Sequence, residues 1–372
     1  MGIIRLILAV SVILSHSGPL FGFQLIPGSL AVQSFYLISG FYISLILGRK
    51  YPLNRDGIYR FYLNRFLRLA AVYWFVLLIS ILVAFLVGST FYLPISSYIE
   101  TISALSWWGK LYILFANFFM IGLDTMMFLK VGDNHSLQFT GLSYAGPMPI
   151  QSLFVIPQAW SLGVELWFYL SAPILVKRKT RTLVLICAAS VVIRALLYKF
   201  GYDKDPWTYR FFPSELLLFV TGILLNRAYF AIREKISLLQ GRTALTLTVV
   251  LVLSFPIWHL ELATKSWIFL IAFAVTLPFT FAYTRNFVHD RRIGELSYPL
   301  YLCHLLVIQI LNFERPRIYS KFPGETAVAL SLVLAWVLYR WIDLPAERLR
   351  NGIPIPWMPT MLSAEVANPD KA

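Results

Sequence analysis

The chain has 372 residues, of which 58% are hydrophobic and 13% charged, and its formal net charge is +14. Soluble domains are about 45–50% apolar and about 25% charged, so this composition excludes a water-soluble enzyme with a single core, and also a disordered chain. A mean hydropathy of +0.70 predicts an all-α polytopic integral membrane protein. The basic residues form short clusters between apolar runs, as in cytoplasmic loops, which favours membrane lipids over nucleic acid as the partner.

Eleven apolar runs are candidate membrane spans. They cover residues 3–22, 29–48, 69–88, 111–129, 158–176, 181–200, 213–228, 243–260, 266–284, 296–312 and 325–343. Basic clusters follow the second, fifth, seventh and ninth runs. If all four clusters are cytoplasmic, an even number of crossings separates the first cluster from the second, although three runs lie between them. One of those three runs therefore does not cross.

The run 111–129 is the weakest of the three, because it contains Asn117 and Asp124 and passes into a polar stretch. We predict a re-entrant or peripheral segment there, which is tolerated where protein surrounds it. About ten transmembrane helices result, with both termini cytoplasmic. Residues 1–350 are expected to form one transmembrane domain, and 351–372 a disordered cytoplasmic tail.

The first span contains Arg5 and His16. Eleven residues at about 100° each place both side chains on one helix face, about 16 Å apart along the axis. Ionisable groups inside a membrane are costly and often functional. Singly, each also has a structural explanation: Arg5 can reach the headgroups, and His16 can close the helix end.

A basic, aromatic segment follows the second span and contains Arg60, Arg65 and Arg68. We interpret it as a loop. Arginines interleaved with aromatic rings suit a bound polyphosphate and purine. The alternative is an amphipathic interfacial helix that the arginines anchor.

Two later spans carry further polar groups. Ser161 and Glu165 are four residues apart and share a helix face, with Trp160 beside them. An interfacial aromatic belt explains the tryptophan, but it leaves a carboxylate two turns inside the span unexplained. In the span that begins near residue 296, Tyr298 and Tyr301 are placed to line one pore. His304, near mid-membrane, is either functional or a hydrogen-bonded packing group.

Cys187 and Cys303 lie inside apolar runs, so neither a disulfide framework nor a cysteine-based metal site is expected. The nucleotide-binding motif of ATP-driven transporters, the H-E-x-x-H metal motif and the G-x-S-x-G hydrolase elbow do not occur in the sequence. We therefore predict no metal site and no permanently bound cofactor.

Taken in order, these motifs resemble the acyltransferase-3 family, membrane O-acyltransferases that modify bacterial surface glycans. The matching positions are Arg5 and His16 (R-x10-H), Phe35 to Phe41 with Ser39 (F-x-x-x-S-G-F), Arg65 and Arg68, Trp160 to Tyr169 with Ser161 and Glu165 (W-S-L-x-x-E-x-x-F-Y), Ser297 to His304 (S-Y-x-x-Y-L-x-H), and Asp343 to Pro345 (E-x-P with Asp for Glu). Ala71 also replaces a frequent proline. We expect no fused SGNH-type domain.

The resemblance implies that an acyl group, expected to be acetyl, moves from cytoplasmic acyl-CoA to a hydroxyl of a glycan or glycolipid such as a surface polysaccharide. It also implies a bacterial cytoplasmic (inner) membrane. We hypothesise that Arg5, Arg65 and Arg68 hold the CoA phosphates and that the pantetheine arm enters the bundle. His16 would act as the general base and Glu165 would assist it.

The remaining polar groups of the motifs are expected to bind substrate or line the pore. They are Ser39, Trp160, Ser161, Tyr298, Tyr301 and His304. Trp107 and Trp108 are expected to stack on a sugar. An acyl-histidine intermediate remains open, as does the oligomeric state. The alternative function is a secondary transporter or flippase of lipid-linked sugar or another small molecule, whose buried charges relay protons.

Overall fold

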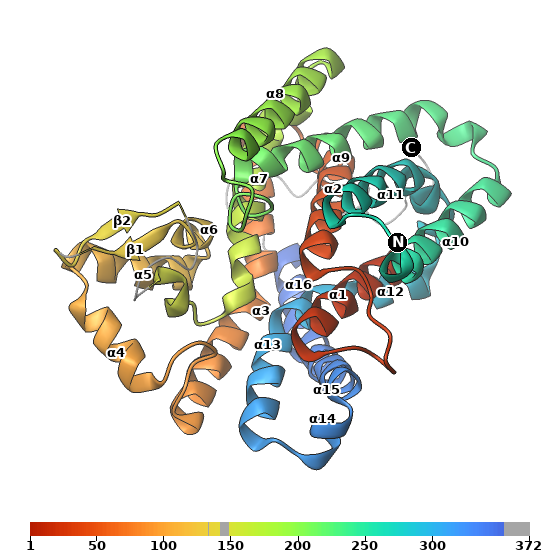
Figure 1. Ribbon diagram of the computed structural model, residues 1–372. Coiled ribbons are helices and arrows are strands. Elements are labelled where there is room, and N and C mark those ends of the chain that lie inside the picture. Colours follow the sequence, from red (N-terminus) through yellow and green to blue (C-terminus); the bar gives the residue numbers. More distant parts are fainter. Residues whose placement is uncertain (133, 142–148, 353–372) are drawn as a thin grey trace.

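Helices make up almost the whole structure (Figure 1). The computed structural model describes residues 1–132, 134–141 and 149–352. Within those residues, nine helices are long and apolar enough to cross a bilayer, some of them extended by an adjoining short helix. Their main parts are α2 (Gly28–Ile46), α3 (Arg55–Val87), α7 (Trp160–Val176), α8 (Thr180–Lys199), α9 (Phe212–Ile232), α10 (Leu238–Ser254), α11 (Leu262–Thr284), α13 (Ser297–Glu314) and α15 (Pro323–Leu338). The predicted all-α polytopic membrane fold is confirmed.

The first helix of the chain, α1 (Gly2–Ser17), is also apolar but shorter, at about 24 Å. A neighbouring short helix, α12 (Val288–Glu295), caps its first turn. The Asp290 carboxylate accepts hydrogen bonds from the backbone N–H groups of Gly2 (2.7 Å) and Ile3 (2.9 Å). A carboxylate at a helix N-terminus satisfies unpaired N–H groups and complements the helix dipole. This contact fixes the start of α1, and with it Arg5, beside α12.

The segment around 111–129 does not form a full span. Helices α4 (Ile95–Ala104), α5 (Trp107–Phe119) and α6 (Leu123–Met126) join the hairpin of β1 (Leu129–Val131) and β2 (Leu137–Phe139) in a lobe beside the bundle (Figure 1). At 13 residues, α5 is about 20 Å long, too short to cross the hydrocarbon alone. The predicted peripheral segment is therefore confirmed.

The predicted basic loop after the second span is wrong, because Arg60, Arg65 and Arg68 lie inside α3. This helix starts at Arg55, where the Asn54 side chain accepts a hydrogen bond from the N–H of Gly57 (2.8 Å). Such an N-cap satisfies an N–H group that has no partner within the helix. The 33-residue helix is about 50 Å long and exceeds the hydrocarbon thickness. The three arginines are therefore held on a helix and not on a loop.

The last long helix does not stop at residue 343. After α15, a π-helical turn (Tyr339–Asp343) leads into α16 (Leu344–Gly352). The remaining connections contain 3-10 turns (Ile150–Leu153, Pro157–Ala159, Arg233–Lys235, Phe255–Ile257) and the short helix α14 (Arg317–Lys321). The predicted tail begins at 351, so residues 353–372 of it lie outside the described residues, and the proposed domain boundary stays a prediction.

Two glycines allow α2 and α9 to pack backbone against backbone. A Cβ atom at Gly40 would lie 2.0 Å from the carbonyl oxygen of Phe219, and one at Gly222 would lie 2.3 Å from that of Leu37. Small residues permit this approach between membrane helices. Because Ser39 precedes Gly40, the same contact positions a polar side chain of the site described below.

We predict that Gly40→Ala destabilises the protein by about 1–3 kcal/mol or more, because the new methyl group meets backbone that cannot rotate away. Thermal unfolding in detergent measures this effect. Gly109→Ala in α5 is the matched control, since its added Cβ would approach a side-chain atom of Leu105 at 3.3 Å and no backbone. An unchanged melting temperature in Gly40→Ala would contradict the packing argument.

Candidate active site

A cavity of about 510 Å³ lies inside the helix bundle. Its walls come from the first turn of α1, from α2, α3 and α7, from the end of α11, from α12 and α13, and from the junction of α15 with α16. On α2 the lining runs from Val32 to Ile46, which corresponds to about 21 Å of helix. Ligand pockets have volumes of about 300–1,000 Å³, so the cavity has the size of a small-molecule site.

Arg5, Arg65 and Arg68 meet at this cavity, although they come from two helices far apart in the sequence. None of them forms an ion pair with a carboxylate among the residues that the structure describes. Elsewhere in the bundle, buried Arg194 is paired with buried Glu215. Desolvated charges without partners are costly. The three arginines therefore form a site suited to an anion.

Arg65 is the most enclosed of the three, with 6% of its surface exposed. Its guanidinium carbon lies 5.9 Å from the ring centres of both Phe61 and Tyr169. Outside the membrane spans, burial lowers the pKa of Lys50, and the charges of Arg350 and Arg65 lower it further. The positive field of the arginines therefore extends to the loop between α2 and α3.

Glu165 lies on the same cavity, held by hydroxyl groups. Ser39 donates a hydrogen bond to its Oε1 atom (2.8 Å), and Tyr169 donates a second to the same oxygen. On α7, Ser161, Glu165 and Tyr169 follow at intervals of four residues, so they share a face and span about 12 Å of the cavity wall. No hydrogen bond joins Glu165 to His16 within the described part of the chain.

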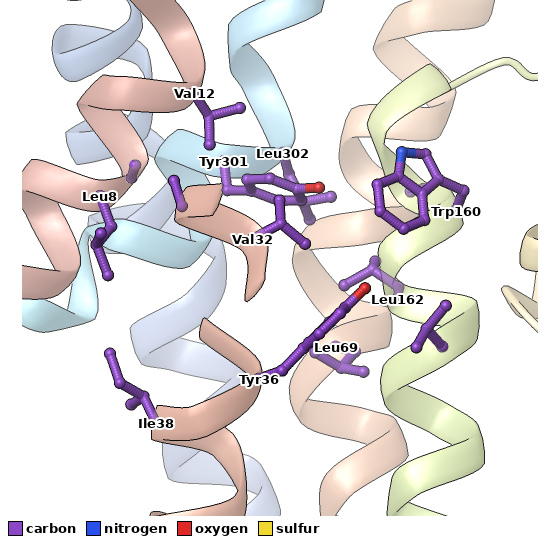
Figure 2. Close-up of a cluster of buried hydrophobic side chains, with 14 of the residues drawn as sticks. Leu8, Val12, Val32, Tyr36, Ile38, Leu69, Trp160, Leu162, Tyr301 and Leu302 are labelled. Atoms are coloured by element: carbon purple, nitrogen blue, oxygen red, sulfur yellow. The ribbon is translucent and has the colours of Figure 1, made fainter. Parts of the chain in front are cut away.

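Tyr36 and Tyr301 line the end of the cavity away from Arg65. The Tyr301 hydroxyl lies 2.7 Å from Oγ of Ser161, and both groups are within hydrogen-bond distance of the Gln158 carbonyl (3.0 and 3.1 Å). Figure 2 shows Tyr36 and Tyr301 extending toward α7, where Trp160 and Leu162 lie. We call this the tyrosine end, and the opposite end the arginine end.

Tyr298 lines the cavity between the two ends. Its hydroxyl donates a hydrogen bond to the backbone carbonyl of Leu69 in α3 (2.6 Å), which ties α13 to the helix that carries the arginines. The polar edge of the ring is therefore occupied within the protein. What Tyr298 offers the cavity is chiefly its aromatic surface.

His16 and His304 lie outside the cavity lining. On α1 the lining ends at Arg5, because Leu8 and Val12, on the face between Arg5 and His16, are packed into the core at 0% and 3% exposure. The two histidine ring centres are 5.6 Å apart, and that of His304 is 5.8 Å from that of Tyr301. The cavity thus follows α2, α7 and α13 rather than α1, and both histidines lie just beyond its tyrosine end.

Trp160 also lies outside the cavity lining, packed with residues near the start of α9. The Arg210 guanidinium sits 4.2 Å from the Trp160 ring centre and 4.6 Å from that of Tyr209, and it forms an ion pair with Asp205 (2.6 Å). This packing occupies one face of the indole. Trp107 and Trp108 are 72% and 75% exposed on the lobe, away from the cavity.

The cavity also contains arginines that the sequence analysis did not select. Arg285 directly follows α11, Arg291 lies in α12, and Arg350 lies in α16, where it pairs with Glu347 (3.6 Å). In the sequence, Arg285 and Arg291 belong to a basic cluster that membrane topology explains. The packing of α11 against α2, of α12 against α1 and of α16 against α3 brings the three arginines to the cavity.

The geometry defines an integral membrane protein with a cavity among its helices that is lined by both charged and apolar side chains. Comparison with known families identifies it further: a model of the acyltransferase-3 family, described as an acyltransferase domain, matches residues 1–341. Because the match covers nearly the whole chain, the protein belongs to this family. It is therefore a membrane-bound O-acyltransferase. The predicted terminal motif at Asp343 lies just beyond the matched range.

A curated relative from Aquifex aeolicus (strain VF5), described as an uncharacterized protein, is 26% identical over 206 residues. The aligned region covers 54% of this chain and 91% of the relative. No solved structure matches the chain.

Proposed function

We propose that the protein transfers an acyl group, acetyl in the simplest case, from cytoplasmic acyl-CoA to a hydroxyl of a glycan or glycolipid such as a surface polysaccharide. The observation that carries this proposal is a set of three arginines on one cavity, none of which forms an ion pair with a carboxylate of the described residues. CoA supplies phosphates, and guanidinium groups bind phosphate oxygens through paired, charge-assisted hydrogen bonds.

The rest of the cavity suits the other end of acyl-CoA. Its apolar walls include Val32, Ile38, Leu69 and Leu162. Apolar walls with a few hydroxyl groups fit a thin pantetheine arm and a short acyl chain. In this arrangement the phosphates stay at the arginine end, and the thioester lies near Tyr301, next to the two histidines.

We propose His16 as the general base for the acceptor hydroxyl. Its side chain is exposed, so an acceptor can reach it from outside the packed core. Proton transfer leads the acceptor oxygen to attack the thioester carbon, the carbon–sulfur bond breaks, and the CoA thiolate leaves. Glu165 is held by Ser39 and Tyr169 on the wall of the cavity. Its role is therefore on the side of the acyl-CoA donor and not in a direct contact with His16.

The same proposal sets the orientation in the membrane. Basic clusters mark the cytoplasmic side, so the arginine end faces the cytoplasm, where acyl-CoA is present. Both termini are then cytoplasmic, the membrane is the bacterial inner membrane, and the acceptor meets His16 near the opposite face.

Thioester consumption tests the proposed function. We expect purified protein in proteoliposomes to release free CoA from acetyl-CoA only when envelope glycans of the producing cells are added, with the labelled acetyl group recovered on the glycan. Mass spectrometry of surface glycans with and without the gene identifies the acceptor. If none of the glycan fractions leads to release of free CoA, that result would contradict acyl transfer and favour transport.

A further inference from the structure

His304 is fully buried in α13, one turn after Tyr301. Its Nδ1 atom lies 2.7 Å from the backbone carbonyl oxygen of Tyr301. A carbonyl oxygen can only accept a hydrogen bond, so Nδ1 carries the proton in the neutral ring. The lone pair is then on Nε2, and the tautomer of His304 is set by its own helix.

Nε2 of His304 is buried and has no hydrogen-bond partner among the residues that the structure describes. A buried acceptor without a donor is unfavourable, so an N–H group that donates to Nε2 would stabilise the site. The neighbouring ring is that of His16, with its centre 5.6 Å away and its plane tilted by 34°. Catalytic hydrogen bonds are often long without substrate and tighten in the reactive complex.

We propose that His304 is a positioning residue for His16, an inference that rests on the proposed function. Nε2 of His304 accepts a hydrogen bond from an N–H of His16. This contact fixes the tautomer of His16, so that its other nitrogen is free to take the proton of the acceptor hydroxyl. The His16 imidazolium formed in this step keeps the hydrogen bond and returns a proton to the CoA thiolate.

The surroundings of His16 support this pairing over one with Glu165. Glu165 is bound by Ser39 and Tyr169 on the cavity wall, whereas the ring of His304 contacts the rings of both His16 and Tyr301. In hydrolase triads a carboxylate holds the tautomer of the catalytic histidine. Here a second, neutral histidine with a fixed tautomer provides the acceptor.

A pair of amide substitutions separates this role from packing. In His304→Asn the amide falls near Nδ1 and keeps the donor to Tyr301, while in His304→Gln it falls near Nε2 and keeps an acceptor for His16. We expect His304→Asn to lower kcat about 100-fold with the KM for acetyl-CoA unchanged, and His304→Gln to stay within about tenfold of the wild-type rate. Melting temperatures and acetyl-CoA binding confirm that both variants fold.

The proposal would be overturned if kcat fell equally in both variants, or if His304→Asn were more active than His304→Gln. If neither variant folds, nitrogen NMR of ¹⁵N-histidine-labelled wild-type protein decides. We expect Nδ1-protonated His304 in contact with His16, and an Nε2-protonated His304 would refute the pairing. A wild-type protein that releases no CoA would instead contradict the proposed function, while the tautomer measurement remains valid.

Discussion

Replacing His16 by alanine is expected to lower the rate of acyl transfer by about 10²- to 10⁴-fold, the usual contribution of a general base. Acetyl-CoA binding should not change, because His16 lies outside the cavity that we assign to the donor. The loss should therefore appear in kcat and not in the KM for acetyl-CoA. Initial rates of free CoA release, measured at saturating glycan acceptor, check this.

The matched control is His259→Ala, in the exposed connection between α10 and α11. It should keep wild-type kinetics. Full acyl transfer by His16→Ala would remove the base assignment. Capture of a labelled acyl group on wild-type protein without acceptor, lost in His16→Ala, would point to an acyl-histidine intermediate in place of direct transfer.

Replacing Arg68 by glutamine is expected to raise the KM for acetyl-CoA about 10- to 100-fold. A hydrogen bond to a charged group contributes about 1.5–3 kcal/mol, and each 1.4 kcal/mol is a factor of ten. Arg65→Gln should act in the same direction and also loosen the packing of Phe61 and Tyr169. Acetyl-pantetheine lacks the nucleotide phosphates, so its KM should not respond to Arg68→Gln.

Arg181→Gln serves as the control, because Arg181 is exposed on α8 and does not line the cavity. It removes the same charge without touching the proposed site. An unchanged KM for acetyl-CoA in Arg68→Gln would contradict the phosphate assignment. If Arg68→Gln raised the KM for acetyl-CoA and for acetyl-pantetheine equally, Arg68 would shape the cavity and would not bind the phosphates.

Hydropathy and charge predicted the membrane architecture well, because a helix must satisfy its backbone groups within the bilayer. The polar interruptions at Asn117 and Asp124 correctly marked the segment that does not cross. The start of α3 was missed because a high local charge resembles a loop. The cap by Asn54, a local side-chain contact, decides instead that the helix begins at Arg55.

The candidate site was predictable in membership but not in shape. The motifs brought Arg5, Arg65, Glu165 and Tyr301 to notice, and the structure places all four on one cavity. Helical periodicity alone suggested a path along α1 from Arg5 to His16. The packing of intervening side chains closes that face, and no periodicity argument contains this information. The functional roles of Arg5, Arg65, Glu165 and Tyr301 remain predictions.

The central claim is that the cavity among the helices is the acyl-CoA site, with phosphates at the arginine end and the thioester at the tyrosine end. A cryo-EM map of the protein with bound acetyl-CoA tests it most directly. We expect phosphate density against Arg65 and Arg68, and the acetyl group near Tyr301, on the His304 side. Acetyl-CoA bound anywhere outside this cavity, or in the reverse orientation, would contradict the account.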